Sequence, residues 1–162
     1  MILRPAAAAD IPAILDLWNP QIRDTTITFS SEEKTPESLS RMMAERRAAG
    51  QEFFLAVEGT ALLGLATYRQ FRLGNGYAHS MEHTIIIGPD AWGRGVGRAL
   101  MTAVEGHARS RGYHTMVAAV AGENARALSF HRALGYVDVG LLPEQGRKFG
   151  RWLDLVLLQK IL

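Results

Sequence analysis

The stretch GPDAWGRGVGRAL, residues 88–100, carries three glycines at alternate positions, Gly93, Gly95 and Gly97. It follows a β-branched run at 85–87 and leads into apolar residues at helical spacing, so the glycines join a strand to the start of a helix. Such a junction can bind an anion, because unpaired N–H groups converge at a helix N-terminus and glycines let the backbone approach a phosphate. Arg94 and Arg98 could add charge-assisted contacts. A tight surface turn would explain the same spacing.

The composition is that of an ordinary globular protein, and 162 residues fit one domain spanning 1–162. No apolar run is long enough to span a bilayer, and Arg4, Pro5 and Asp10 interrupt the start where a secretory signal would be apolar. Cysteine is absent, which excludes disulfides and thiolate metal sites and fits a reducing cytoplasm. The net charge of +2 is small. We therefore expect a cytoplasmic domain with no metal, no membrane contact and no nucleic-acid partner.

The hydrophobic pattern predicts elements in the order β-α-α-β-β-β-α-β-α-β-β, which implies a mixed α/β sheet with helices on both faces. We expect Asp10 to cap the first helix and Pro20 to end or kink it. A hairpin is expected at Gly59 and Thr60, and a polar loop at 23–35. The predicted strands are 2–6, 52–58, 61–71, 77–88, 114–121, 135–142 and 151–161, and the predicted helices are 10–20, 35–50, 97–112 and 124–134.

Two well-known phosphate loops differ from the glycine stretch. A Walker loop needs Lys followed by Ser or Thr where Arg98 and Ala99 stand. A dinucleotide-binding fold places its glycines after the first strand, whereas these lie past the middle of the chain. The stretch instead resembles the acetyl-CoA pyrophosphate loop of the GNAT N-acetyltransferases, whose pattern is Arg/Gln-x-x-Gly-x-Gly/Ala. In this register Gly95 and Gly97 are the two glycines, and Trp92 replaces the Arg or Gln, which puts one side-chain contact of the family in question.

Further segments extend the resemblance over nearly the whole chain. ENARALSFHRALGY, residues 123–136, is similar to the family's Asn-x-x-Ala-x-x-Phe/Leu-Tyr-x-x-x-Gly-Phe segment. Together with MEHTIII (81–87) and GRKFGRWLDLVLLQ (146–159), it resembles the phosphinothricin and methionine-sulfoximine acetyltransferase branch. Several motifs in the right order are more specific than one. The resemblance implies a GNAT-like three-layer fold, with a central mixed, mostly antiparallel sheet flanked by helices on both faces.

The resemblance also implies acetyl-CoA as cosubstrate. The pantetheine arm would lie along the strand edge at 85–87, although three isoleucines are equally typical of a buried strand. The pyrophosphate would meet the main-chain amides of 93–98. An asparagine at 124 would hydrogen-bond the cofactor or substrate, although capping its helix would alone explain it. The residues that the resemblance assigns to the cofactor are Ile85, Ile86, Ile87, Gly93, Arg94, Gly95, Val96, Gly97, Arg98 and Asn124.

Two residues are candidates for acid–base chemistry. Glu82 is the expected general base, acting directly or through water; a Glu at a strand start is more often solvated or ion-paired, but the EHT resemblance favours catalysis. His131 stands where most GNAT enzymes carry the tyrosine that protonates the thiolate, and the branch has histidine there. Imidazole can donate or accept a proton near pH 7, whereas without the motif we would interpret His131 as a helix-surface residue. His83 should point to the opposite sheet face from Glu82, so we expect it to be structural or to support the substrate site from outside.

An α-amino-acid acceptor needs its carboxylate held while its amine faces the thioester. By resemblance Arg72 would bind that carboxylate, a task that suits a guanidinium fork. Tyr77 and Phe29 could line the side-chain pocket. An ordinary surface arginine and two core aromatics are the alternatives. The basic residues of 146–151 either shape the substrate entrance or belong to a solvated hairpin.

These expectations combine into one hypothesis, a cytoplasmic N-acetyltransferase that moves acetyl from acetyl-CoA to the α-amine of a small amino-acid-like acceptor. Phosphinothricin, methionine sulfoximine and methionine sulfone are the candidates, and the sequence leaves open whether the acceptor is an antibiotic or a metabolite. Direct attack in a ternary complex is expected, since no cysteine can carry an acyl group. The alternatives are another amine, such as a protein N-terminus or a polyamine, or a module that binds acetyl-CoA without turnover. The resemblance also implies a homodimer.

Overall fold

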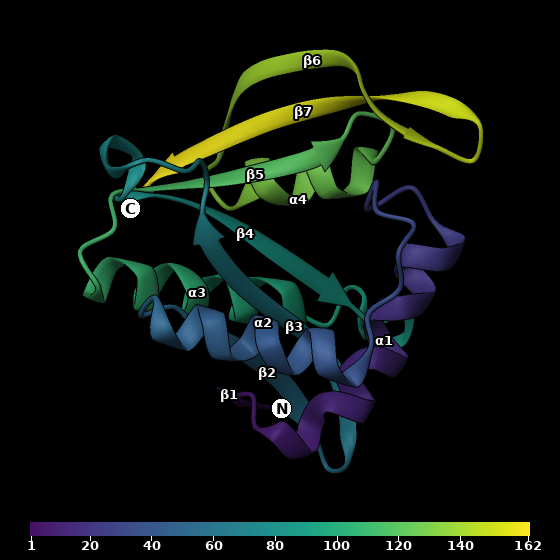
Figure 1. Cartoon of the computed structure of the whole chain (residues 1–162), viewed down its shortest axis with the longest axis vertical. Helices are drawn as coiled ribbons and strands as arrows, with labels where there is room; N and C mark the ends of the chain where they lie inside the picture. Colours follow the sequence, from purple (N-terminus) through teal and green to yellow (C-terminus); the bar gives the residue numbers. More distant parts are fainter.

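A seven-stranded sheet forms the centre of the computed structural model, which describes all residues 1–162 (Figure 1). The strand order is β1-β2-β3-β4-β5-β7-β6. Every neighbouring pair is antiparallel except β4 and β5, so the prediction of a mixed, mostly antiparallel sheet is confirmed. The strands are β1 (Ile2–Pro5), β2 (Phe53–Glu58), β3 (Ala61–Gln70), β4 (Ser80–Ile87), β5 (Thr115–Ala121), β6 (Val137–Lys148) and β7 (Arg151–Ile161).

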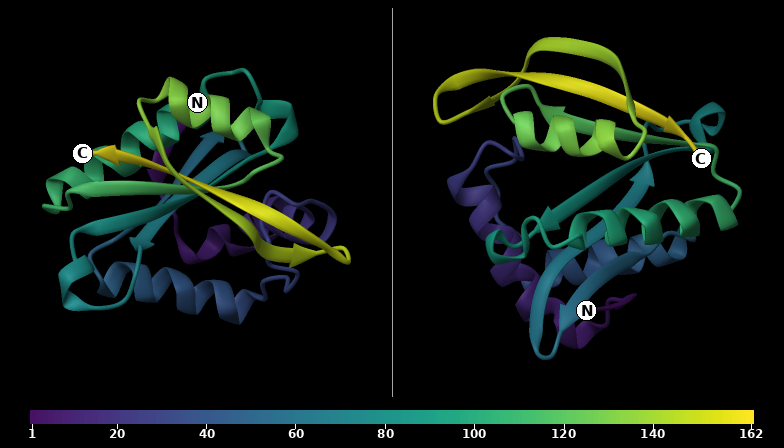
Figure 2. Two further views of the ribbon diagram at one scale, coloured as in Figure 1. Left: turned by 90° about the horizontal axis from the view of Figure 1, so that it is seen from above. Right: turned by 180° about the vertical axis from the view of Figure 1, so that it is seen from behind.

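Four helices cover the two faces of this sheet, as the element order predicted (Figure 2). The helices α1 and α2 lie on one face, and α3 and α4 lie on the other. Each pair of helices packs on the sheet over its own hydrophobic core. Burial of one large apolar side chain contributes about 1.5–3 kcal/mol to the stability of the fold. The helices are α1 (Ile11–Asp24), α2 (Pro36–Ala48), α3 (Val96–Ser110) and α4 (Ala125–Ala133).

The first helix departs from the prediction at both ends. Pro20 lies inside α1 and does not end it, because Trp18 and Ile22 on either side of it are both buried in the core under the helix. Asp10 stands at the N-cap position but makes no capping hydrogen bond. Its carboxylate accepts two hydrogen bonds from the Arg4 guanidinium, each 2.7 Å long, and therefore ties β1 to the helix start.

Two strands differ in extent from the prediction. The fourth strand starts at Ser80 rather than 77, because Asn75–Tyr77 form a short 3-10 turn after Gly74, whose φ is 110°. The sixth strand continues to Lys148 rather than ending at 142, because it follows β7 through two register shifts. The hairpin at Gly59 and the helix start at Thr35 agree with the prediction.

The feature that decides the site is the short contact between β4 and β5. The two strands pair only from Ser80 to Glu82, against Thr115–Val117. Beyond Glu82, β4 stays paired with β3, and β5 stays paired with β7, so the two strands separate as Figure 1 shows. From His83 onward the edge of β4 that faces β5 therefore has free backbone groups in the middle of the sheet.

Candidate active site

Two cavities open where β4 and β5 separate. The first, of about 400 Å³, contains Glu82 and is called here the Glu82 cavity. The second, of about 430 Å³, is lined by the glycine stretch and is called the glycine-loop cavity. They share a boundary formed by Ile27, Ile85, Ile86, Asn124, Ala127 and His131. Two ligands bound in these cavities would therefore meet at that boundary.

The glycine-loop cavity has an anion-binding floor made of backbone. Gly93 and Gly95 have φ angles of 75° and 79°, values that favour glycine, and Gly95 precedes the first residue of α3. No hydrogen bond within the protein uses the amides of 95–98. A Cβ on Gly97 would lie 3.1 Å from the Phe130 ring, so a glycine is needed for α3 to approach α4 closely. Free amides at a helix N-terminus are suited to an anion, and this is where the sequence analysis expected the pyrophosphate.

The side chains around this floor divide into two groups. Arg98 lines the cavity, as expected, whereas Arg94 turns away and its guanidinium pairs with Glu58 at 2.7 Å. Trp92 also lines the cavity, and the Arg126 guanidinium stacks 4.0 Å from the centre of its ring. Sequence reasoning missed Arg126. It brings a positive charge from α4 to the side of the cavity where the family's Arg or Gln is replaced by Trp92.

The isoleucines at 85–87 belong to the buried strand that the sequence predicted, and their position also leaves room for the expected pantetheine arm. Ile86 is buried in the core under α1, and Ile85 and Ile87 pack against the core under α3. All three also line the glycine-loop cavity, where their backbone faces the open edge of β4. Asn124 lines both cavities, and its Oδ1 accepts a hydrogen bond from the Ala127 amide at 3.1 Å, which caps α4.

Glu82 lies in its cavity beside a cation that the sequence analysis did not identify. Arg69 is directly opposite Glu82 in the β3–β4 register, and its guanidinium is 3.3 Å from the Glu82 carboxylate. Lys34 lines the same cavity, with its ammonium 4.4 Å from the centre of the Trp18 ring. Burial and the nearby Arg46 guanidinium lower the pKa of Lys34. Two cations, Arg69 and Lys34, thus share the cavity with the Glu82 carboxylate, an arrangement suited to an anionic ligand.

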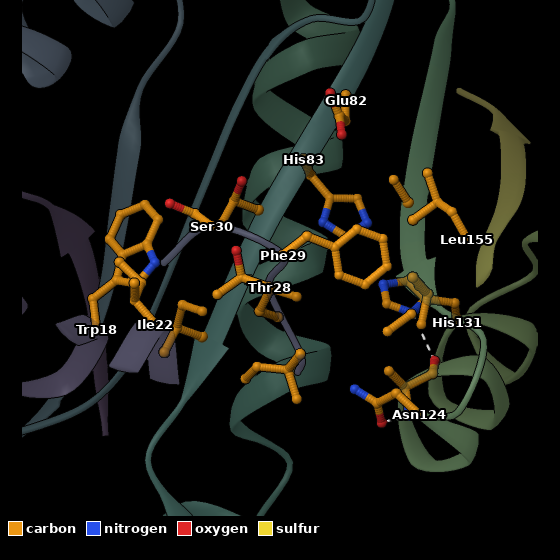
Figure 3. Close-up of a pocket in the computed structure, with 18 of the residues that line it drawn as sticks. Trp18, Ile22, Thr28, Phe29, Ser30, Glu82, His83, Asn124, His131 and Leu155 are labelled. Atoms are coloured by element: carbon orange, nitrogen blue, oxygen red, sulfur yellow. Dashed lines mark hydrogen bonds between the residues drawn. The ribbon is translucent and has the colours of Figure 1, made fainter. Parts of the chain in front are cut away.

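The wall opposite Glu82 is the loop between α1 and α2, residues 25–35. Phe29 projects from this loop into the cavity, as the sequence predicted (Figure 3). Lys148 of β6 is only 4% exposed, and its ammonium donates to the carbonyls of Ile22 and Thr28 at 2.6 and 2.8 Å. The ring of Phe29 occupies the space that a Cβ on Gly146 would fill. The hairpin at 146–151 is therefore partly structural, since it holds the cavity wall in position.

Arg151 and Arg147, the other two basic residues of this hairpin, take different positions. The Arg151 guanidinium donates to Glu123 at 2.8 and 2.9 Å, and Glu123 in turn accepts from the Thr26 hydroxyl. Arg147 stacks on Trp152 at 5.0 Å, and that ring is exposed. Arg151 therefore stabilises the position of the 25–35 loop, whereas Arg147 belongs to the solvated part of the hairpin.

His83 is placed differently from the prediction. It was expected on the sheet face opposite Glu82, away from the pocket, yet both residues line the Glu82 cavity (Figure 3). The physical reason is the separation of β4 from β5, which lets one cavity reach both faces of the sheet. The His83 ring stacks on His131 with centroids 5.0 Å apart. Burial lowers the pKa of both histidines, to about 3 for His83.

Arg72 and Tyr77 lie outside both cavities. The Arg72 guanidinium stands 5.3 Å from the centre of the Tyr77 ring, in the segment between β3 and β4. Neither residue is among those that line the Glu82 cavity, where the sequence analysis expected them to contact the acceptor. Within one chain, Arg69 and Lys34 are the cations at this cavity instead.

The His, Asp and Glu side chains nowhere gather in a group of three or more that could hold a metal ion. No helix has both the length and the apolar character needed to cross a membrane.

Comparison with known proteins agrees with this geometry. The model of the acetyltransferase (GNAT) family matches residues 12–136. The chain is 35% identical over 161 residues to an L-methionine sulfoximine/L-methionine sulfone acetyltransferase of Pseudomonas aeruginosa, covering 97% of this chain and 92% of that protein. It is 33% identical over 157 residues to a phosphinothricin N-acetyltransferase of Streptomyces coelicolor, with coverage of 94% and 91%.

A solved structure extends the agreement to three dimensions. A GNAT phosphinothricin acetyltransferase from Sinorhizobium meliloti, in complex with acetyl-CoA, matches with a TM-score of 0.94 and 28% identity. The match covers 99% of this chain and 88% of that one. Because the family model, the relatives and the fold agree along the chain, this protein belongs to the GNAT family and is an acetyl-CoA-dependent N-acetyltransferase.

Proposed function

We propose that this enzyme acetylates the α-amine of a small amino-acid-like acceptor, of the phosphinothricin, methionine sulfoximine or methionine sulfone type. The observation that carries the proposal is the pair of cavities that meet at His131 and Asn124. One cavity offers free amides for phosphates, and the other offers a carboxylate among cations. The names of the relatives from Pseudomonas aeruginosa and Streptomyces coelicolor support the acceptor class.

In the proposed mechanism the amine attacks directly in a ternary complex, because the chain has no cysteine to carry an acyl group. When bound, acetyl-CoA supplies the activated acyl group as a thioester. Glu82 accepts the first proton of the ammonium group, directly or through water, to give the neutral amine. The free backbone N–H groups along the open edge of β4 can stabilise negative charge on the acyl oxygen.

The acceptor's carboxylate is assigned here to Arg69 and Lys34, since both line the Glu82 cavity. Arg72, the sequence-based candidate, is compared with Arg69 by matched variants. Arg69→Met is expected to raise KM for the acceptor about 10- to 100-fold, because a hydrogen-bonded ion contributes about 1.5–3 kcal/mol. Arg72→Met is expected to change it less than twofold. The opposite ranking would return the role to Arg72.

The acceptor class is tested with a panel of amines in a thiol-release assay. Phosphinothricin, methionine sulfoximine and methionine sulfone are expected to give the highest kcat/KM, and their decarboxylated analogues much lower values. Polyamines are disfavoured, because cations in the cavity repel them. Activity limited to a peptide N-terminus or a polyamine would contradict the proposal. Acetyl-CoA binding by calorimetry without thiol release for any amine would indicate a non-catalytic binding module.

We also propose that the enzyme is a homodimer and works in the cytoplasm. The location stays a prediction from the cysteine-free sequence. The dimer is supported by exposed apolar side chains on β6 and β7, namely Val137, Val139, Leu141 and Trp152, which are each more than half exposed. Sedimentation is expected to give the mass of two chains. The double variant Val139→Glu, Leu141→Glu is expected to give the mass of one chain. A wild-type monomer at micromolar concentration would contradict the proposal.

A further inference from the structure

Buried polar atoms without partners gather in one place beside the two cavities. Six buried side-chain nitrogen or oxygen atoms of the protein lack a hydrogen-bond partner. One belongs to Arg46, and the other five belong to His83, His131, Tyr136 and Glu105. Orphaned polar atoms are costly to bury, so such a concentration requires a physical explanation.

The orientation of His131 fixes where its proton lies. Its Nδ1 is 2.7 Å from the carbonyl oxygen of Ala127, and a carbonyl can only accept, so Nδ1 carries the hydrogen. The neutral ring therefore has its lone pair on Nε2, which is buried and has no partner. His131 lines both cavities, and Nε2, the ring atom left to accept a proton, lies buried beside their boundary.

Behind this imidazole lies a carboxylate that the mechanism above does not use. The Tyr136 ring is 5.4 Å from the His131 ring and 5.8 Å from the His83 ring, with its edge toward both. Burial and the nearby Glu105 carboxylate raise the pKa of Tyr136. Glu105 of α3 is 7% exposed, and its Oε2 accepts a hydrogen bond from the Lys160 ammonium of β7 at 2.6 Å. Its Oε1 has no partner.

We propose that Glu105 is a positioning residue, the buried counter-charge for the imidazolium that forms when His131 Nε2 accepts a proton. The catalytic use of that imidazolium rests on the proposed function. Glu82 takes the first proton of the ammonium and releases it to solvent. As the amine's N–C bond forms, one of its two N–H bonds breaks and an N–H bond forms at His131 Nε2, while the other N–H bond stays in the amide. That bond then breaks as the coenzyme's departing sulfur takes the proton.

The charges around His131 come from each element packed against it. His83 of β4 stacks on His131, and Tyr136, which follows α4, packs against it. The Glu105 carboxylate of α3 acts on His131 and is bonded to Lys160 of β7, while Glu82 of β4 lines the same cavity. His83 is kept neutral by burial, which leaves Glu105 as the buried anion on the side away from the acceptor. The carboxylate favours a charged His131, and Lys160 opposes this effect.

Glu105→Gln and Lys160→Met form a matched pair that tests this electrostatic role. The imidazole of His131 is titrated by NMR in each full-length variant without ligands. We expect Glu105→Gln to lower the pKa of His131 and Lys160→Met to raise it, because the first removes a negative charge and the second a positive one. A merely structural disturbance would move both in the same direction. Shifts of the same sign, or no shift in Glu105→Gln, would overturn the proposal.

Turnover tests the catalytic part separately. Glu105→Gln is expected to lower kcat about tenfold, with KM for acetyl-CoA and for the acceptor little changed, because the protein binds both substrates elsewhere. A normal kcat together with the NMR shift would remove His131 from the proton transfer and overturn this part. If the wild type acetylates no amino acid, the proposed function fails instead, and the titration still decides whether Glu105 acts on His131.

Discussion

The two cavities are built in opposite ways. The glycine-loop cavity takes its floor from one continuous segment, residues 93–98, and the free amides at 95–98 do not depend on side-chain identity. The Glu82 cavity is assembled from side chains of distant segments, with Lys34 from a loop, Arg69 from β3 and Glu82 from β4. A backbone site tolerates a departure such as Trp92, whereas a side-chain site changes its ligand when one residue changes. This difference explains why one family can keep its donor and vary its acceptor.

The largest expected effect is a loss of turnover when the Glu82 carboxylate is removed from the Glu82 cavity. Glu82→Gln keeps the shape of the cavity but removes the proton acceptor. We expect kcat/KM to fall about 100- to 10,000-fold, while acetyl-CoA binding measured by calorimetry stays intact. Gly95→Ala is the matched variant on the donor side, where a φ of 79° disfavours alanine and acetyl-CoA binding should weaken. Normal turnover in Glu82→Gln would exclude it as the base.

The same difference decides how much could be predicted from the sequence. The order of strands and helices along the chain and the glycine loop follow from local periodicity and turn residues, and most elements were predicted close to their bounds. Arg69 was missed, because its position opposite Glu82 depends on the register set by the β3–β4 connection. His83 was expected away from the pocket, because alternation along a strand does not reveal that one cavity reaches both faces of the sheet where β4 and β5 separate. Trp92 gave no local sign of its contact with Arg126.

Two buried histidines beside the cavities, His83 and His131, make stability depend on pH. Burial lowers the pKa of His83 to about 3 and also lowers that of His131, so below the ordinary value of 6.5 the unfolded chain binds more protons. The free energy of unfolding should therefore fall as pH drops from 6.5, by up to about 1.4 kcal/mol per pH unit for each histidine. Urea unfolding at several pH values measures this. His83→Phe should reduce the slope of the unfolding free energy against pH by an amount equivalent to about one proton. An unchanged slope would contradict the view that His83 is buried in its neutral form.

A smaller effect on acceptor binding is expected from a substitution in the wall of the Glu82 cavity that changes no charged group. A Cβ on Gly146 would occupy the space of the Phe29 ring, so Gly146→Ala should displace that wall of the Glu82 cavity. We expect KM for the acceptor to rise about tenfold, the cost of misplacing one apolar contact, while KM for acetyl-CoA stays within twofold. Gly140→Ala, on the same strand with open space around its Cβ, is the control. Equal effects on both substrates would indicate general distortion.

The smallest effect concerns Trp92, the departure within the glycine loop. If a family contact were simply missing there, Trp92→Arg would restore it and tighten acetyl-CoA binding. The structure leads to the opposite expectation, because the Arg126 guanidinium already stacks 4.0 Å from the Trp92 ring and supplies the positive charge. A cation–π contact at an exposed site contributes about 0.5–1 kcal/mol, so Trp92→Ala should weaken acetyl-CoA binding about two- to fivefold. Trp92→Arg should weaken it at least as much, since two guanidinium groups repel each other, and Arg126→Met should match Trp92→Ala. In calorimetric titrations, tighter binding by Trp92→Arg would show that Arg126 does not replace the missing contact.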